Sequence, residues 1–156
     1  LDPAQVTNIH YFGATAFKNG RMVKYVKTKV AAFSPGQKTD LGKVITALLA
    51  EGQTNMAAGS AEDVKAGRAL FADQFDCGQC HQLHNTDDSA TAPDLTGYAS
   101  REWLISFIGN PKQDKFYGKR NDRMPAFAVE NILDSESIAL LADWLRGDWP
   151  GATQLR

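Results

Sequence analysis

The ten residues FDCGQCHQLH, at positions 75–84, constrain the fold of this chain more than any other stretch. They contain both cysteines of the 156-residue sequence, Cys77 and Cys80, and His81 follows the second one directly. Such a cluster serves one of three chemistries: a thiol–disulfide couple, a zinc site, or covalent attachment of a haem. Each of these requires a different fold around it, so the rest of the sequence has to discriminate among them.

The spacing C-x-x-C-H is typical of c-type haem attachment. The two thiols can reach two positions on one edge of the macrocycle, and the histidine then directs its imidazole at the iron. A thiol–disulfide motif is expected beside a βαβ pattern, which this sequence lacks. A zinc set of Cys77, Cys80, His81 and His84 would be cramped, because the two halves of a zinc site usually lie about a dozen residues apart or more. Haem attachment is therefore the favoured interpretation.

An electron-transfer haem commonly takes methionine as its second axial ligand, opposite the histidine. Met124 is the candidate, because it lies in a stretch interrupted by prolines and glycines and precedes Pro125. Proline fixes the backbone and removes an N–H donor, which suits a loop that holds a ligand. We expect one haem c, with His81 and Met124 on the iron, since no second C-x-x-C-H occurs.

The composition is that of a globular protein, 43% hydrophobic and 22% charged, with a net charge of −1. This balance gives no general attraction to nucleic acid or to anionic lipid. The longest apolar run, residues 44–50, is much shorter than the roughly 20 residues of a membrane helix. The chain starts at Leu1 without a basic and apolar leader, so we expect a processed protein or a fragment.

Helical patterns divide the sequence into two parts. A basic stretch at 1–59 ends in an amphipathic helix at 39–52, capped by Thr39 or Asp40. Three further helices are expected after a polar linker, each with its own N-terminal cap: 60–75, 100–109 and 134–147. No alternating run is long enough for a sheet. The predicted class is all-α, with domains at 1–59 and 60–150 and a tail at 151–156.

The first part parallels the end of the second in the order of its features. Tyr11-Phe12-Gly13, Met22 and the helix at 39–52 correspond to Phe116-Tyr117-Gly118, Met124 and the helix at 134–147, although the spacings differ. Residues 1–59 are therefore either a degenerate half-repeat without haem or an unrelated helical extension.

Residues 60–150 resemble a class I cytochrome c, which implies three to four helices around a covalently bound haem. The resemblance rests on features that occur in the family's order: Gly67 and Phe71 before CGQCH, APDLTG at 92–97, RMPAF at 123–127, and Trp144 in the last helix. It implies that Gly67 lets the first and last helices of the domain cross closely beside Phe71 and Trp144. The stretches APDLTGYASREWL and NPKQDKFYGKRNDRMPAF are similar to cytochrome c domains fused to, or associated with, bacterial cytochrome bc-type quinol–cytochrome c reductases.

The same resemblance assigns roles to the residues of the expected site. Cys77 and Cys80 form the thioethers, His81 and Met124 bind the iron, and the Pro93 carbonyl accepts the His81 ring N–H and orients the imidazole. Three side chains are candidates for contacts with the haem propionates: Tyr98, Arg101 and Trp103. The alternatives are a core position for Trp103 and a solvated one for Arg101.

The function implied by the resemblance is that of an electron carrier, not an enzyme by itself, in a respiratory chain as part of or beside a quinol–cytochrome c reductase. The expected donor is a Rieske protein or a cytochrome b complex, and the expected acceptor is a cytochrome c or a terminal oxidase. Haem attachment of this kind predicts a periplasmic location or the outer face of the cytoplasmic membrane, with membrane contact only through a partner or a missing anchor. The alternatives are a soluble shuttle for another dehydrogenase or oxidase, and a peroxidase-type enzyme if Met124 leaves the iron open.

Charge is distributed unevenly along the chain. The loop at 111–124 carries five cations against two acids. In the stretch 82–96, by contrast, every charged residue is an acid: Asp87, Asp88 and Asp94. We expect the basic loop to lie over one haem face and to steer an acidic redox partner, which raises the rate of encounter more than the affinity. The alternative is a loop that is charged because it is exposed.

Overall fold

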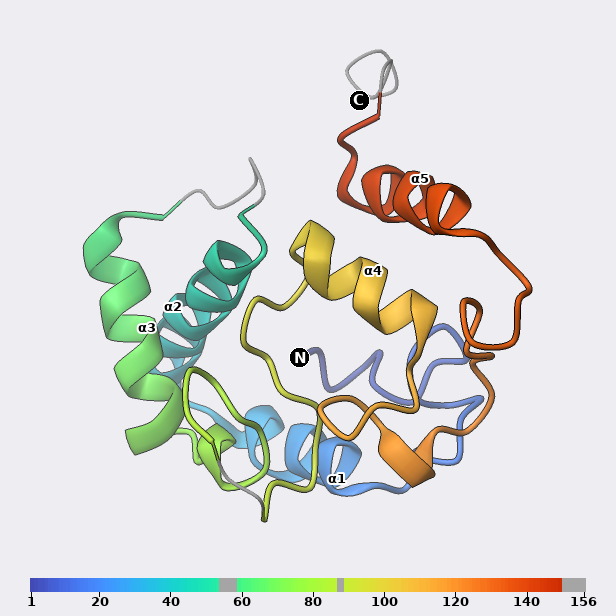
Figure 1. The fold of residues 1–156 in the computed structure, drawn as a ribbon. Helices are drawn as coiled ribbons and strands as arrows, with labels where there is room; N and C mark the ends of the chain where they lie inside the picture. The colour runs from blue at the N-terminus through green and yellow to red at the C-terminus, as the bar shows by residue number, and fades with distance from the viewer. Residues whose placement is uncertain (54–58, 87–88, 150–156) are drawn as a thin grey trace. The chain divides into compact units, whose positions relative to one another are not determined.

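The computed structural model describes residues 1–53, 59–86 and 89–149, and these residues form an all-helical structure without strands (Figure 1). Five α-helices occur in the described residues: α1 (Arg21–Thr28), α2 (Pro35–Glu51), α3 (Ala61–Asp73), α4 (Arg101–Gly109) and α5 (Ser135–Arg146). Three short 3-10 turns accompany them: η1 (Val30–Ala32), η2 (Cys77–Gln79) and η3 (Gly118–Arg120). The all-α prediction is confirmed. Within the described ranges, no helix is long and apolar enough to cross a bilayer.

The chain forms two compact units, Leu1–Gly42 and Lys43–Arg156, so the boundary lies inside α2. The first unit contains α1, which the sequence analysis did not predict. Met22 lies within α1, whereas its suggested counterpart Met124 lies outside any helix, so the two stretches differ in local structure. The domain limits after residues 59 and 150 stay predictions, and both the tail at 151–156 and most of the linker lie outside the described residues.

Side-chain caps explain where α2, α3, α4 and α5 begin. Ser60 and Asp63 form the predicted capping box at α3. The other predicted caps are present at α4 and α5, where Ser100 and Asp134 each accept a backbone N–H. The predicted start of α2 near residue 39 is wrong, because Ser34 and Gln37 form an earlier capping box and Pro35 follows in the first turn.

The α3 helix approaches α2 closely at Gly67. A Cβ atom on Gly67 would lie 2.6 Å from the carbonyl carbon of Lys43 and 2.9 Å from Cβ of Ala47, both in α2. The expectation that Gly67 serves a crossing with the last helix is therefore wrong. Because Gly67 has no side chain, α3 can lie against the second half of α2.

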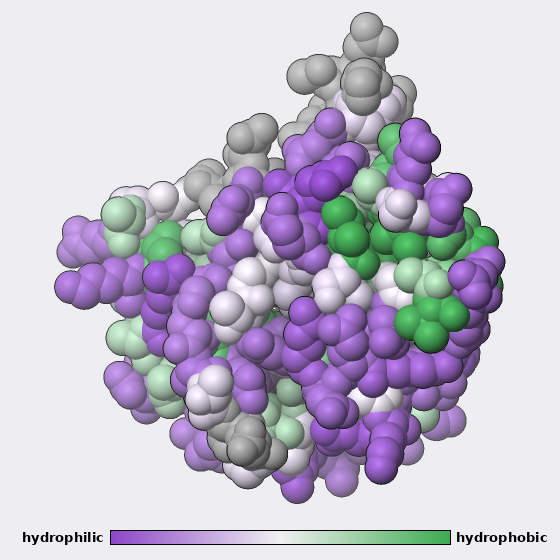
Figure 2. Space-filling view, in the orientation of Figure 1, coloured by the Kyte–Doolittle hydropathy of each residue, from purple (hydrophilic) through white to green (hydrophobic). Residues whose placement is uncertain are grey.

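The α5 helix packs against α4 with only part of its apolar surface. Ile138 and Ala142, one turn apart, are buried, and the adjacent face carries an ion pair between Asp143 and Arg101 of α4. Trp144 is 61% exposed, although the resemblance implied that a helix crossing lies beside it, and Leu145 is 56% exposed. Part of the apolar surface of α5 is therefore exposed, and Figure 2 shows a hydrophobic area in the region that α5 occupies in Figure 1.

Candidate haem site

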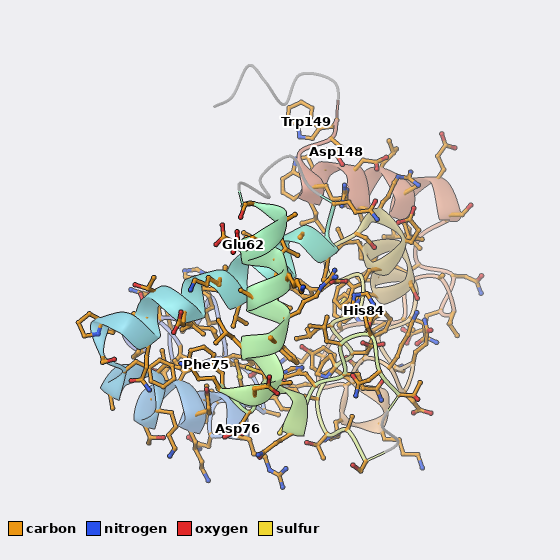
Figure 3. The ribbon with its side chains drawn as sticks, turned by 90° about the vertical axis from the view of Figure 1, so that its left-hand side faces the viewer. Glu62, Phe75, Asp76, His84, Asp148 and Trp149 are labelled. Atoms are coloured by element: carbon orange, nitrogen blue, oxygen red, sulfur yellow. The ribbon has the colours of Figure 1, made fainter. Side chains whose placement is uncertain are left out.

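The cysteine motif lies in one tight turn after α3. Phe75 is buried, and Asp76 then adopts a left-handed conformation, with φ of 53°, that redirects the chain (Figure 3). The N–H groups of Cys80 and His81 both donate to the carbonyl of Cys77, at 3.2 and 3.0 Å. A left-handed residue other than glycine costs about 1 kcal/mol or more, and such strain is concentrated at functional sites. The turn thus gathers the two thiols and the imidazole onto one short segment.

Both cysteines are free thiols and half-buried. Burial raises the pKa of the Cys77 thiol to about 11, so it stays protonated near neutral pH. A thiol–disulfide couple needs a thiolate at its attacking cysteine, and this environment opposes one. In the part of the chain that the structure describes, no three histidine, cysteine or acidic side chains converge as a metal site, so the alternative zinc set is not assembled.

The His81 ring is oriented by the backbone of Pro93. Nδ1 lies 2.8 Å from the Pro93 carbonyl oxygen, and since a carbonyl can only accept, Nδ1 carries the proton. Nε2 therefore holds the lone pair that a metal ion requires. Burial lowers the pKa of His81, an effect that the bond to Pro93 partly opposes, so the ring is neutral near pH 7. This is the contact that the resemblance implied, and it prepares Nε2 as a ligand.

Backbone hydrogen bonds hold the segment 91–95 against the motif. Thr91 and Ala92 both donate to the Cys80 carbonyl, at 3.2 and 3.0 Å, and Leu95 donates to the carbonyl of Gln82 at 2.9 Å. This ladder places Pro93 opposite His81. The APDLTG loop and the C-x-x-C-H turn are therefore one structural unit.

Met124 lies in the irregular segment after η3 and is half-buried. The Asn121 side chain donates to the Met124 carbonyl at 2.7 Å, and Arg120 donates to the Thr91 carbonyl at 2.6 Å, which ties this segment to the motif. Neither contact was anticipated from the sequence. Ligation by Met124 stays a prediction, and the two contacts show how its loop is held.

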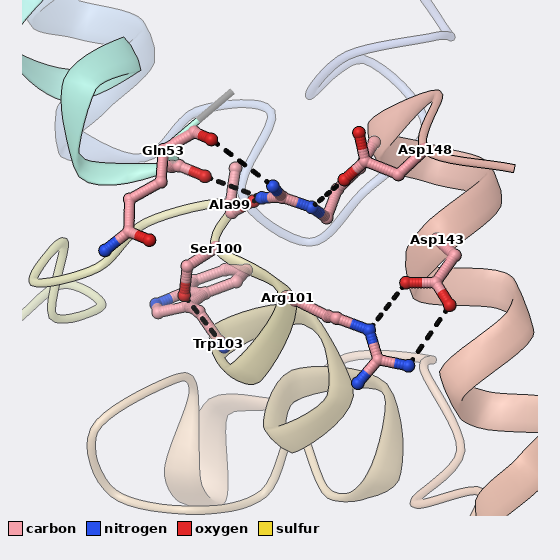
Figure 4. A network of polar contacts seen from close by, with 9 residues as sticks. Gln53, Ala99, Ser100, Arg101, Trp103, Asp143 and Asp148 are labelled. Atoms are coloured by element: carbon pink, nitrogen blue, oxygen red, sulfur yellow. Dashed lines mark hydrogen bonds and ion pairs between the residues drawn. The ribbon is translucent and has the colours of Figure 1, made fainter. Parts of the chain in front are cut away.

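The three propionate candidates have defined partners in the structure. The Trp103 ring N–H donates to the Asp94 carbonyl at 3.3 Å, and its ring lies 5.0 Å from those of Tyr98 and Phe107. Trp103 is half-buried and belongs to this aromatic cluster. Arg101 forms a two-pronged ion pair with Asp143, at 2.6 and 3.1 Å (Figure 4). Propionate contacts by Tyr98, Arg101 and Trp103 stay predictions.

A buried carboxylate that the sequence analysis missed also contacts this region. Glu51, the last residue of α2, accepts hydrogen bonds from Arg68, His84 and the N–H of Gly97. Burial alone would raise the pKa of Glu51, but these bonds outweigh it and lower the pKa, so the group is ionised at neutral pH. The position of Glu51 at the end of a helix is a signal that could have revealed it. A carboxylate at a helix C-terminus interacts unfavourably with the helix dipole, so it needs hydrogen-bond donors from other segments.

The family model for cytochrome c matches residues 64–149, which is more than half of the chain. This chain belongs to the cytochrome c family. Searches of curated proteins and of solved structures each gave no significant match. A cytochrome c is an electron-transfer protein with covalently bound haem c, so the resemblance inferred from the motifs is confirmed at this level.

The residues of this cytochrome c fit a covalently attached haem. Two unpaired, half-buried thiols lie one turn apart, and a neutral imidazole follows with Nδ1 satisfied and Nε2 left to bind iron. Cys77 and Cys80 would hold the porphyrin edge, and His81 would hold the iron. The donor set matches the chemistry of haem c and opposes that of a thiolate site.

Proposed function

We propose that this cytochrome c binds one haem with His81 and Met124 as axial ligands, and that it carries single electrons in a bacterial respiratory chain. Its place is as part of, or beside, a quinol–cytochrome c reductase at the periplasmic face of the membrane. The observation that carries the ligation is the hydrogen bond from His81 Nδ1 to the Pro93 carbonyl, which fixes the tautomer that binds iron.

The chain's own residues hold the ligand and exclude water. The Pro93 carbonyl keeps the imidazole in one orientation and raises the basicity of Nε2. The aromatic cluster of Trp103, Phe107 and Phe116, with ring centroids 5.0 to 5.1 Å apart, provides a rigid apolar wall. When bound, the haem supplies a one-electron change of its iron, and methionine ligation and an apolar surrounding both favour the reduced state.

The partner is proposed to be an acidic redox protein that approaches the basic loop at 111–124. Two of the five cations are paired locally, Lys112 with Glu130 and Arg123 with Asp122. Lys115 and Lys119 are exposed and have no ion pair among the described residues, so their charge is available to a partner. The donor would be a Rieske protein or a cytochrome b complex, and the acceptor a cytochrome c or a terminal oxidase.

Met124→Ala tests the ligation. The variant should keep its covalent haem but lose the absorption band of methionine-to-iron ligation near the red end of the oxidised spectrum, and its reduction potential should fall. Met22→Ala is the matched control, because Met22 lies in α1 of the other unit, and it should change neither quantity. An unchanged band and potential in Met124→Ala would contradict the assignment. Peroxide turnover by the unmodified protein would favour the peroxidase alternative.

Cell fractionation and reconstitution test the location and the context. Haem-loaded protein should be recovered with periplasmic or membrane material, and purified protein should accept electrons from a quinol–cytochrome c reductase supplied with quinol. Recovery of the haem-loaded form in the cytoplasmic fraction would contradict the location. Reduction by another dehydrogenase, but not by the reductase, would replace the proposed context with that of a soluble shuttle.

A further inference from the structure

The C-terminal end of α2 lies outside the region that matches the cytochrome c family, yet it is bonded to the segments of the haem site. The Glu51 side chain is only 4% exposed. Its Oε1 accepts from Arg68 Nη2 and from His84 Nε2, both at 2.8 Å, and its Oε2 accepts from the Gly97 N–H at 3.0 Å. Both carboxylate oxygens are thus used, and two of the three donors belong to the loop that follows the cysteine motif.

The two donors from the loop lie at its ends. His84 follows His81 by three positions, and Gly97 follows Pro93 by four. The His84 N–H also donates to the Thr96 hydroxyl at 2.9 Å, so the two ends are tied to each other as well as to Glu51. Figure 3 shows His84 on this loop. Glu51 therefore closes the loop that contains the acceptor of the His81 ring N–H.

A second set of contacts holds the end of α2 in the same place. Arg146 of α5, whose side chain is 10% exposed, donates from Nη1 to the carbonyls of Gly52 and Ala99 at 2.6 and 2.8 Å (Figure 4). Gly52 follows Glu51, and Ala99 lies two residues after Gly97. The contact between α2 and the haem loop is thus held on one side by the buried Glu51 carboxylate, which accepts, and on the other by the Arg146 guanidinium, which donates and is only 10% exposed.

We infer that Glu51 is a positioning residue for the haem ligand His81: by clamping His84 and Gly97 it holds the Pro93 carbonyl in place, and so it sets the reduction potential. This inference rests on the proposed function, because it requires that His81 binds iron. It also makes the second half of α2 a working part of the haem domain.

Two physical effects of Glu51 have opposite signs. A negative charge stabilises the more positive oxidised haem, so removal of the charge raises the potential. Loss of the clamp frees the loop and admits water to the haem, which also stabilises the oxidised form and lowers the reduction potential. The two effects can therefore be distinguished by comparing a variant that keeps the shape of Glu51 with one that does not.

The experiment compares Glu51→Gln and Glu51→Ala in the haem-loaded full chain. Both remove the charge, but glutamine keeps one of the two acceptor oxygens, whereas alanine keeps none. The reduction potential of Glu51→Ala should be about 59 mV lower than that of Glu51→Gln. For a one-electron couple, this corresponds to an about tenfold higher ratio of oxidised to reduced protein at the same applied potential. Hydrogen exchange at the Gly97 amide should be faster in Glu51→Ala. Glu62→Gln and Glu62→Ala, at an exposed glutamate in the first turn of α3, should match the unmodified protein in both measurements.

Equal potentials in the two Glu51 variants, with unchanged exchange at Gly97, would overturn the inference. If Glu51→Ala does not retain haem, His84→Ala decides the question, because His84 is half exposed and its removal leaves the buried carboxylate in place. A lower potential and faster Gly97 exchange in His84→Ala support the clamp, and values equal to the unmodified protein refute it. An unmodified protein without the histidine–methionine spectrum would instead refute the proposed function.

Discussion

The packing of α3 on α2 predicts opposite effects for the same substitution at two helical glycines. Glycine in a helix interior costs about 1 kcal/mol relative to alanine, so a replacement without steric conflict should stabilise the protein by that amount. Gly42 in α2 meets this condition, because a Cβ added there has no neighbour within 4 Å. Gly67 in α3 does not, since its Cβ would lie 2.6 Å from the carbonyl carbon of Lys43.

The cost at Gly67 follows from the nature of the neighbouring atoms. The nearest ones belong to the backbone of α2, which cannot rotate away as a flexible side chain does. Overpacking of this kind costs about 1 to 3 kcal/mol, and a whole helix has to shift, so the upper part of that range applies. After subtraction of the gain of about 1 kcal/mol in helix propensity, Gly67→Ala should lower the free energy of unfolding by about 1 to 2 kcal/mol.

Denaturation in guanidinium chloride, followed by helical circular dichroism of the haem-loaded protein, measures both changes. Gly42→Ala should raise the midpoint and Gly67→Ala should lower it, and the melting temperatures should move by about 2 to 4 °C for each kcal/mol. The haem spectrum serves as a control that the ligands are still in place. If Gly67→Ala proves as stabilising as Gly42→Ala, α3 does not lie against α2 as described.

Three further predictions concern charge and capping. Reversal of Lys115 and Lys119 to glutamate should slow electron transfer to an acidic partner at low salt and leave the potential nearly unchanged. The effect should weaken with added salt, because the Debye length falls from about 30 Å at 0.01 M to about 10 Å at 0.1 M. A rate that depends neither on salt nor on the charge reversal would place docking elsewhere. The lowered pKa of Glu51 means that its stabilising effect is present above its ordinary value of 4.5 and is lost as the pH falls below it, so acid unfolding should be less steep in Glu51→Gln; identical pH profiles would contradict this. Ser60→Ala should cost about 1 kcal/mol, because the Asp63 N–H loses its acceptor, and an unchanged midpoint in urea would argue against the capping box.

The haem motif and the later helices could be predicted because their signals are local. C-x-x-C-H is a covalent requirement within five residues, and the boxes or caps at Ser60, Ser100 and Asp134 act within three positions of each helix start. The bond from His81 to Pro93 was reached through the resemblance, not through the spacing of the two residues. The start of α2 was misplaced although its signal was also local, because the box at Ser34 precedes the apolar pattern.

What failed were statements about which helix lies against which. The pattern in α5 marks several apolar positions but cannot show that α4 covers only the face of Ile138 and Ala142. Gly67 signals a close approach of backbones without identifying the partner, and the partner is α2. Glu51 was missed because its three donors come from segments 17 to 46 positions away, and no local pattern encodes such a convergence.

The bonds from Arg146 also have a consequence for the order in which the chain folds. Arg146 and Gly52 are 94 positions apart, so they can meet only after the loop between them has closed. Contacts of such sequence separation are slow to form, because the entropy of the intervening chain has to be lost first. During synthesis α5 leaves the ribosome after the segments that Arg146 contacts, so the carbonyls of Gly52 and Ala99 lack this hydrogen-bond donor until then. Completion of the haem domain is thus a late event that depends on its final helical turn.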